Sequence, residues 1–309
     1  MRVWLPYASL AEAEARIGHH DGIEVTLLDD ADGLAETAKD VAYIALPNFT
    51  AMRVWQDLKH FDLPSLKVVQ LGSAGYEGMP ALVGDGVSIA NAAGVHDAGT
   101  AEMAVALALA NLRGLDTYAR LQPTHTWTPS FGRSLADRHV LIFGYGRIGA
   151  AVERRVAGFD PASVVRVARS PRTDPEVHAA ADLHALLPAA DVVFITAPAT
   201  PDTAGTFDAT ALALLPDGAL VVNVGRGTIM VTDAIIAEAG RLRFALDVVD
   251  PEPLPAESPL WDAPGVTIAP HVGGANDSAP VRYDRLIGAQ LAHLAAGEPY
   301  ENIVWGPLA

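Results

Sequence analysis

The chain has 309 residues, of which 50% are hydrophobic, and it carries a formal net charge of -16 and no cysteine. A chain of this length and composition is globular and long enough for two domains. The lack of cysteine excludes disulfides, thiolate catalysis and cysteine-ligated metal centres, and we predict no metal site. The negative charge argues against nucleic acid and membrane surfaces as partners, because both would repel the chain.

Short apolar runs rich in Val and Ile alternate with helical patterns along almost the whole chain. Runs that are apolar on both faces are typical of parallel strands covered by helices on both sides. We therefore predict an α/β protein with two Rossmann-like, doubly wound parallel sheets and a cleft between the two domains. The expected strands are 2–5, 24–28, 41–46, 67–71 and 87–91 in the first sheet, and 139–143, 163–168, 191–196, 218–223, 243–248 and 266–269 in the second.

An alanine- and leucine-rich segment, 98–115, lies between the two series and predicts a long buried helix. Its most apolar part, 103–112, is shorter than the ~20 residues that a membrane span requires. The N-terminus lacks the apolar segment of a secretory signal, so we expect a cytoplasmic protein. The last helical pattern, 281–296, is expected to return to the first sheet. The predicted domains are residues 1–97 plus 279–309, and residues 98–278.

A glycine-rich turn lies between the apolar run 140–143 and a helical pattern. The first glycine permits a sharp turn, the second lets the backbone approach a pyrophosphate, and the third lets helix and strand pack closely. The helix N-terminus then offers N–H groups and a partial positive charge to phosphates. We predict that this turn binds a dinucleotide, the alternative being a turn formed for steric reasons alone. Its residues are Gly144, Tyr145, Gly146, Arg147, Ile148 and Gly149.

Three polar residues follow the ends of apolar runs in the second series: Arg226, Glu252 and His271. Each alone is more typical of an ordinary surface or loop position. Because ligands of open α/β sheets lie at the carboxyl ends of the strands, the three residues are expected near one edge of the sheet. Together they suit hydride transfer: arginine anchors a carboxylate, and a carboxylate beside histidine favours the protonated imidazole that donates a proton.

Six motifs occur in order at 139–149, 195–203, 220–228, 245–255, 258–261 and 268–274. With the segment 91–113, they resemble the D-isomer-specific 2-hydroxyacid dehydrogenase family over nearly the whole chain. The resemblance implies that Arg226 binds the substrate carboxylate and 2-oxo group, and that Glu252 supports His271 as the general acid/base. It implies that Asp247 holds the nicotinamide carboxamide.

The same resemblance implies that the backbone N–H groups of Ser73, Ala74 and Gly75 cradle the substrate carboxylate, although an ordinary turn would have the same sequence. It adds cofactor contacts at Thr100, Pro198, Thr203 and Val224. The loop 47–50 is expected to face the cleft, with Asn48 contacting substrate, or to be a plain loop. A homodimer formed through the cofactor domain is also implied. Helix 101–112 is either the contact in this dimer or part of the core packed between the two domains.

One departure from the family concerns the cofactor. Members that bind NAD carry an acidic residue about 20 residues after the glycine turn, where it bonds the ribose hydroxyls. Here Arg169, Ser170 and Arg172 occupy this region. An arginine can bind a 2′-phosphate in a forked contact, whereas a carboxylate would repel it. We therefore predict NADP as the preferred cofactor and NAD as the alternative. The other interpretation is that the two arginines are ordinary surface residues of a loop and bind no cofactor.

These expectations combine into an oxidoreductase that transfers a hydride between NADP(H) and a small 2-oxo or 2-hydroxy acid, such as glyoxylate or hydroxypyruvate. Two alternatives remain open from the sequence. One is a phosphoglycerate or phosphite dehydrogenase on the same scaffold. The other is a non-enzymatic, dinucleotide-sensing protein like the corepressors of this fold, which can keep Arg226, Glu252 and His271. A further group of residues is expected to be structural: Asp30, Asp32, His96 and Trp127.

Overall fold

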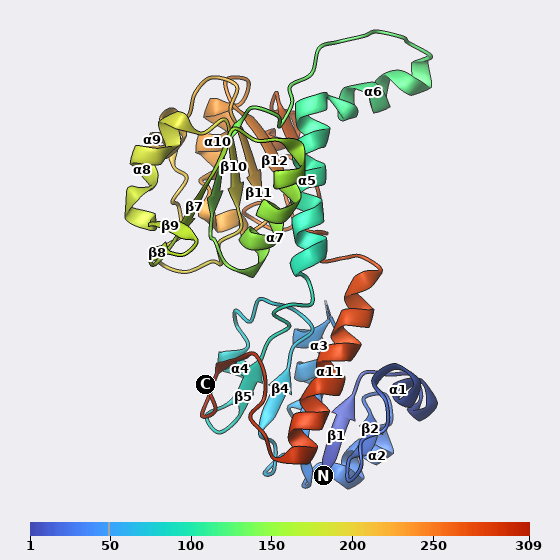
Figure 1. The fold of residues 1–309 in the computed structure, drawn as a ribbon. Coiled ribbons are helices and arrows are strands. Elements are labelled where there is room, and N and C mark those ends of the chain that lie inside the picture. The colour runs from blue at the N-terminus through green and yellow to red at the C-terminus, as the bar shows by residue number, and fades with distance from the viewer. Residues whose placement is uncertain (49) are drawn as a thin grey trace. The chain divides into compact units, whose positions relative to one another are not determined.

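The computed structural model describes residues 1–48 and 50–309. The chain forms two compact units, one of Met1–His96 with Asp277–Ala309 and the other of Asp97–Asn276. We call these unit 1 and unit 2. The predicted domain boundaries lie close to these limits. Each unit is a sheet covered by helices on both faces, as expected for doubly wound α/β structure (Figure 1).

Unit 1 contains a six-stranded sheet in the order β14-β5-β4-β3-β1-β2. All neighbours are parallel except β14, which runs antiparallel to β5 at the sheet edge. The five predicted strands of the first series are present, whereas β14 was not predicted as a strand. The strands are β1 Arg2–Leu5, β2 Glu24–Leu27, β3 Val41–Ala45, β4 Val68–Gln70, β5 Ser88–Ala90 and β14 Ile303–Trp305.

Alternate residues of β1 point to the two faces of this sheet. Val3 and Leu5 pack with the helices α1 and α11, while Trp4 packs with α2, α3 and α4. This period-2 division explains why the strand is apolar throughout. Helix bounds in unit 1 are α1 Leu10–Ile17, α2 Ala31–Thr37, α3 Ala51–Leu58, α4 Pro80–Val83 and α11 Ser278–Ala296.

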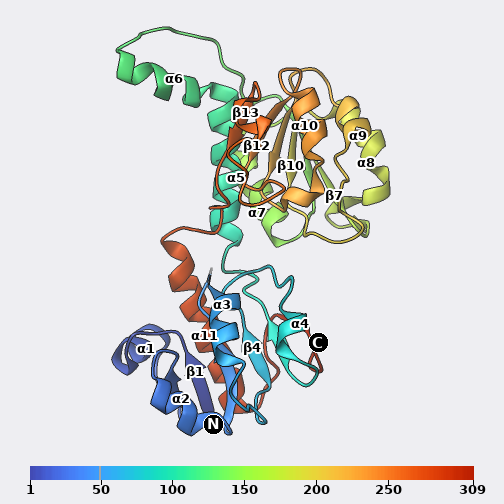
Figure 2. The ribbon, with the colours of Figure 1, turned by 180° about the vertical axis from the view of Figure 1, so that it is seen from behind.

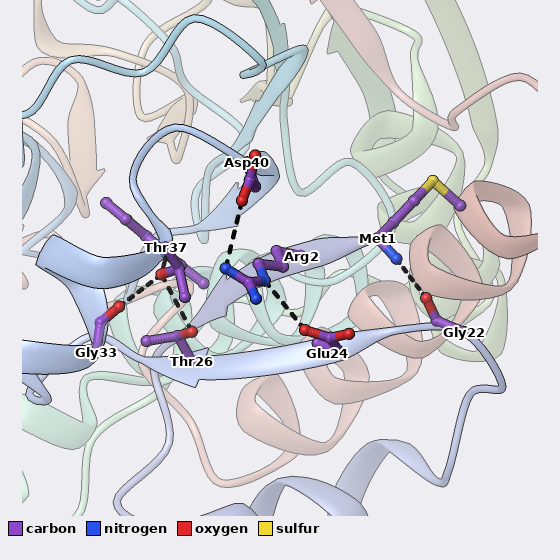
Figure 3. A network of polar contacts seen from close by, with 9 residues as sticks. Met1, Arg2, Gly22, Glu24, Thr26, Gly33, Thr37 and Asp40 are labelled. Atoms are coloured by element: carbon purple, nitrogen blue, oxygen red, sulfur yellow. Dashed lines mark hydrogen bonds and ion pairs between the residues drawn. The ribbon is translucent and has the colours of Figure 1, made fainter.

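Polar contacts surround the N-terminal end of β1 (Figure 3). The Met1 amino group donates to the Gly22 carbonyl, and Arg2 bonds Glu24 at 3.0 Å and Asp40 at 3.4 Å. Arg2 and Glu24 are also register partners in the parallel pair β1–β2. Because these charged side chains are partly exposed, they reinforce the strand register but contribute little stability compared with the buried sheet.

Unit 2 contains an eight-stranded sheet in the order β13-β12-β11-β10-β6-β7-β9-β8. The chain adds strands on one side of β6 and then crosses to the other side at β10. Ligands of such sheets bind outside the carboxyl ends of the strands at this reversal. The strands are β6 His139–Phe143, β7 Ser163–Ala168, β8 Arg172–Thr173, β9 Glu176–Ala179, β10 Val192–Ile195, β11 Leu220–Asn223, β12 Arg243–Leu246 and β13 Val266–Ile268.

Helices cover both faces of this second sheet. Val140 and Ile142 of β6 pack with α5 and α7, while Leu141 and Phe143 face the opposite core with α8, α9 and α10. The bounds are α5 Asp97–Arg113, α7 Arg147–Val156, α8 Leu183–Leu186, α9 Ala209–Ala213 and α10 Thr232–Glu238. Short 3-10 helices are Gln122–Thr124, Ala157–Phe159, Ala180–Asp182, Leu187–Ala189, Gly227–Ile229 and Pro259–Asp262.

The long alanine-rich helix α5 packs inside unit 2. Ala101, Ala104, Ala108 and Leu112 are buried in the core that α5 shares with α7 and the sheet. Helix 101–112 therefore contributes to the core of unit 2. Among the described residues, no helix combines the length and the apolar character that a bilayer span requires.

An extended segment follows α5, and we call it the arm, residues 115–134. It begins with α6 (Leu115–Leu121) and continues through Gln122–Thr124 into a loop. In Figure 1 the arm projects away from the sheet of unit 2, and Figure 2 shows the same projection from behind. The arm therefore leaves its side chains largely outside the core of its own unit.

Candidate active site

The predicted glycine turn joins β6 to α7, and its three glycines have different surroundings. Gly144 has φ +99, and a Cβ there would lie 2.3 Å from the Ala197 backbone nitrogen. A Cβ on Gly149 would lie 2.8 Å from the Gly144 carbonyl oxygen. Gly146 differs, because no atom of the described residues lies within 4 Å of a Cβ placed there. Its small size serves no internal packing, which leaves open space above the start of the helix.

The open space at Gly146 suits the phosphates of a dinucleotide. Gly146 is the N-cap of α7, a helix of ten residues, and no side chain caps it. The first-turn N–H groups and the helix dipole are thus directed at this space. A cavity of about 570 Å³ begins there. The cavity is lined by Phe143, Gly144, Tyr145, Gly146, Ala168, Arg169, Ala180, Ala181, Thr196, Ala197, Pro198, Thr200, Asp202, Thr203 and Thr206.

The cavity brings together part of the predicted cofactor set. Gly144, Tyr145, Gly146, Arg169, Pro198 and Thr203 all line it, from the loops after β6, β7 and β10. These loops lie on adjacent strands at the reversal point of the sheet, which fits a dinucleotide. Other predicted contacts lie outside the lining: Thr100, Arg147, Ile148, Gly149, Ser170, Arg172, Val224 and Asp247.

Arg172 is held against the glycine turn. Its Nη2 donates to the Tyr145 carbonyl oxygen at 2.5 Å, and its guanidinium lies 5.4 Å from the Tyr145 ring centroid. Arg166 lies 5.6 Å from the same ring. In contrast, Arg169 makes no hydrogen bond or ion pair with any residue that the structure describes. Arg169 follows β7 directly and is exposed, so its guanidinium is available to a ligand.

The ion pair of Glu153 with Arg166 holds the Tyr145 side chain in place. The Tyr145 hydroxyl donates to Glu153 of α7, and Glu153 forms an ion pair with Arg166 of β7. Burial, together with the bond to Glu153, raises the pKa of Tyr145 above its ordinary value. The hydrogen bond from Arg166 lowers the pKa of Glu153. Tyr145 therefore stays protonated and Glu153 ionised near neutral pH, which keeps this contact between turn, helix and strand in place.

The three predicted catalytic residues follow three neighbouring strands. Arg226 comes after β11, Glu252 after β12 and His271 after β13. The structure places the His271 Nδ1 2.8 Å from Glu252 Oε2, while Glu252 Oε1 accepts a bond from the Val249 N–H at 3.0 Å. With a carboxylate at Nδ1, that nitrogen carries its hydrogen, and Nε2 is left to exchange a proton.

Asp247 holds the backbone beside His271. This carboxylate is 2% exposed and accepts the N–H groups of Val272 and Gly273, each at 2.9 Å. Its carbonyl oxygen also accepts the His271 N–H at 2.8 Å. A Cβ on Gly273 would lie 2.7 Å from Asp247 Oδ2, so glycine is needed there. Sequence reasoning had assigned Asp247 only to the cofactor, because such backbone bonds leave no sequence signal.

Asn223, which sequence reasoning missed, fixes the loop that carries Arg226. Its side-chain amide donates to the Arg226 carbonyl, and its Oδ1 accepts the Gly225 N–H, both at 3.0 Å. A Cβ on Gly227 would overlap the Val249 carbonyl oxygen at 1.8 Å. The loop after β11 therefore touches the loop that carries Glu252. Polar residues that end a strand within an N-x-G sequence are the signal that would have found Asn223.

The predicted substrate contacts of unit 1 also follow strands. Ser73, Ala74 and Gly75 form a half-buried turn after β4, and Asn48 follows β3. A Cβ on Gly72 would lie 2.7 Å from the Asn48 backbone nitrogen, so the two loops are in close contact. Phe49 of the predicted loop 47–50 lies outside the described residues. Within the described ranges, no cluster of His, Asp or Glu is arranged to hold a metal ion.

Comparison with known proteins decides the family. The model of the D-isomer specific 2-hydroxyacid dehydrogenase NAD binding domain matches residues 105–273. The chain belongs to this family. Its fold, family and class as a nicotinamide-dinucleotide-dependent dehydrogenase are thereby confirmed, and the non-enzymatic alternative loses its support.

Named relatives differ in their substrates. This dehydrogenase is 30% identical to glycerate dehydrogenase of Hyphomicrobium methylovorum over 295 residues, which cover 89% of this chain and 88% of the relative. It is 34% identical over 250 residues to D-3-phosphoglycerate dehydrogenase of Mycobacterium tuberculosis, covering 76% of this chain but 46% of that one. A solved NADPH-dependent glyoxylate/hydroxypyruvate reductase from Sinorhizobium meliloti, in complex with NADP and sulfate, is 28% identical, with TM-score 0.79 and 98% of each chain covered.

Proposed function

We propose that this dehydrogenase reduces a small 2-oxo acid, glyoxylate or hydroxypyruvate, with NADPH. The observation that carries the proposal is the His271–Glu252 pair at 2.8 Å, held on the strand ends next to the Arg226 loop. Two relatives support the substrate class, the glycerate dehydrogenase and the glyoxylate/hydroxypyruvate reductase. Glycerate is the 2-hydroxy acid that reduction of hydroxypyruvate produces, so both names describe the same chemistry.

A nicotinamide dinucleotide held in the cavity beside the glycine turn would supply the hydride that the carbonyl carbon receives. His271 Nε2 gives a proton to the carbonyl oxygen, which completes the conversion of C=O to CH–OH. Glu252 stabilises the imidazolium through Nδ1 and fixes the ring orientation. Arg226 binds the substrate carboxylate and stabilises the negative charge that grows on the carbonyl oxygen before protonation.

The preference for NADP rests on Arg169. It lines the cavity next to the glycine turn, its guanidinium is unengaged among the described residues, and no carboxylate takes its place after β7. The N-terminus of α7 would hold the pyrophosphate, and Arg169 the 2′-phosphate. The presence of NADP in the related Sinorhizobium structure agrees with this proposal.

A spectrophotometric screen that follows the absorbance of the reduced nicotinamide tests the function. We expect NADPH oxidation with glyoxylate and hydroxypyruvate, and a lower kcat/KM with NADH. Preferential use of 3-phosphohydroxypyruvate would instead support a phosphoglycerate dehydrogenase, and reduction of NADP or NAD by phosphite would support a phosphite dehydrogenase. Inactivity with every 2-oxo acid and both cofactors would overturn the proposal.

We further propose that the enzyme is a homodimer joined through unit 2, with the arm as the contact. Trp127 is 95% exposed and Phe131 is fully exposed. The arm also contains a cavity of about 600 Å³, and its lining includes Tyr118, Leu121 and Trp127. Large apolar side chains gathered on a projecting segment are typical of an interface with another protein. A second copy of the chain is the partner that the family resemblance implies.

The double variant Trp127→Glu with Phe131→Glu should convert the dimer to a monomer at micromolar concentration, because two charges would be buried unpaired in the contact. Sedimentation velocity measures this directly. Leu308→Glu serves as the control, since Leu308 is 53% exposed but lies in unit 1. A monomeric parent enzyme, or a double variant that remains dimeric, would contradict the proposal.

A further inference from the structure

We propose that Asn91 is a positioning residue that shapes the turn after β4 into a nest of backbone N–H groups for the substrate carboxylate. The inference rests on the proposed reduction of a 2-oxo acid. It concerns the hydrogen bonds within unit 1 that fix the carbonyl groups of this turn. Asn91 follows β5, the strand next to β4, and is 9% exposed.

Four consecutive carbonyl oxygens, those of residues 72–75, each accept a hydrogen bond from within unit 1. The donors are His96 Nε2 to Gly72 at 2.7 Å, the Ala92 N–H to Ser73 at 2.8 Å, Asn91 Nδ2 to Ala74 at 2.7 Å and the Ser73 hydroxyl to Gly75 at 2.7 Å. The turn therefore directs its acceptors into the protein.

Peptide geometry determines where the donors point. In a trans peptide the carbonyl of one residue and the N–H of the next point in opposite directions. Because the carbonyls of residues 72, 73 and 74 point inward, the N–H groups of Ser73, Ala74 and Gly75 point outward. None of these three N–H groups has a hydrogen-bond partner among the described residues. Successive unpaired N–H groups on a half-buried turn form a concave site for an anion.

Asn91 is the side chain best placed to enforce this arrangement. Its Oδ1 accepts the Ala93 N–H at 3.1 Å, which fixes the amide orientation and aims Nδ2 at the Ala74 carbonyl. A carboxylate there would turn an oxygen toward that carbonyl and repel it, so the amide is required. His96, predicted to be purely structural, holds the Gly72 carbonyl in the same way. The nest thus recognises a carboxylate without a formal charge of its own.

Asn91→Ala and Asn91→Asp test the inference. We expect KM for glyoxylate or hydroxypyruvate, and the inhibition constant of oxalate, to rise about tenfold, the effect of losing one anchored group. We expect kcat to fall by less than about threefold and the dissociation constant of NADP, measured by calorimetry, to stay unchanged. Asn302→Asp is the matched control, because Asn302 Nδ2 donates to the neighbouring Ala93 carbonyl and not to the turn.

The outcomes separate the inference from the proposed function. If the parent reduces 2-oxo acids but the Asn91 variants keep its KM and oxalate constant, the function stands and the inference fails. A fall in kcat alone, or equal effects in the Asn302 control, would give Asn91 a merely structural role and also overturn it. A parent that reduces no 2-oxo acid overturns both. Should Asn91→Ala fail to fold, Ser73→Ala loosens the same turn at the Gly75 carbonyl and should raise KM about threefold.

Discussion

Replacement of His271 by alanine should lower kcat for 2-oxo acid reduction about 10³-fold, because a positioned general acid contributes roughly 10²–10⁴-fold. Without the imidazole, the oxygen that receives negative charge during hydride transfer has no proton donor at hand. The change should leave cofactor binding intact, since the cavity next to the glycine turn is lined by other loops. Steady-state kinetics and a fluorescence titration with NADPH measure the two effects separately.

The backbone at His271 calls for a second variant. His271 has φ +54, a left-handed conformation that costs alanine energy but that asparagine adopts readily. His271→Asn should therefore show the same loss of kcat without added strain. His184→Ala is the control, because His184 is an exposed histidine on α8. If kcat of both His271 variants stays within about threefold of the parent, well short of the loss that a general acid implies, the proton donor lies elsewhere.

The central strands could be predicted because their signal is local. All eleven predicted strands are present, since buried parallel strands are apolar on both faces. The strands β8, β9 and β14 were missed. β8 and β14 are edge strands of two and three residues, and β9 is a four-residue strand beside β8. Their length is not the reason, because β4, β5 and β13 also have three residues each and were predicted. The pairing of β8, β9 and β14 depends on where the chain returns to the sheet, which no local pattern specifies.

The placement of the candidate catalytic residues after strand ends could be predicted, whereas the hydrogen bonds that hold the surrounding loops could be predicted only in part. Arg226, Glu252 and His271 stand at strand ends, a position that sequence reveals, and the His271–Glu252 contact agrees with the pairing that the family resemblance implies. The bonds between loop backbone and the side chains of Asp247 and Asn91 could not be predicted. They join residues from separate loops or turns, and nothing in the side-chain type specifies which carbonyl or N–H lies opposite.

The different surroundings of the two arginines after β7 could also not be predicted from the sequence. The sequence treats Arg169 and Arg172 alike, as cations near a 2′-phosphate. The structure gives them different surroundings, because Arg172 bonds the Tyr145 carbonyl and lies over its ring, while Arg169 lines the cavity unengaged by the described residues. A guanidinium that holds the glycine turn contributes to the affinity for both NAD and NADP. A guanidinium that binds the 2′-phosphate contributes to the affinity for NADP alone.

Two alanine variants distinguish these roles. Arg169→Ala should raise the dissociation constant of NADP about 100-fold, the loss of a forked, charge-assisted contact, and change that of NAD less than threefold. Arg172→Ala should raise the dissociation constants of NADP and NAD by a similar factor of about ten, because the glycine turn loses a hydrogen bond and a ring contact. Calorimetric titrations with NADP and NAD provide all four constants.

Arg154→Ala is the matched control, since Arg154 is an exposed arginine on α7 that lies outside the cavity lining. It should change neither constant and so excludes a general effect of removing one positive charge from a strongly negative protein. Equal weakening of NADP and NAD by Arg169→Ala would show that Arg169 does not read the 2′-phosphate. A loss confined to NADP in Arg172→Ala would transfer that role to Arg172, and the bond to Tyr145 would then have to break when the cofactor binds.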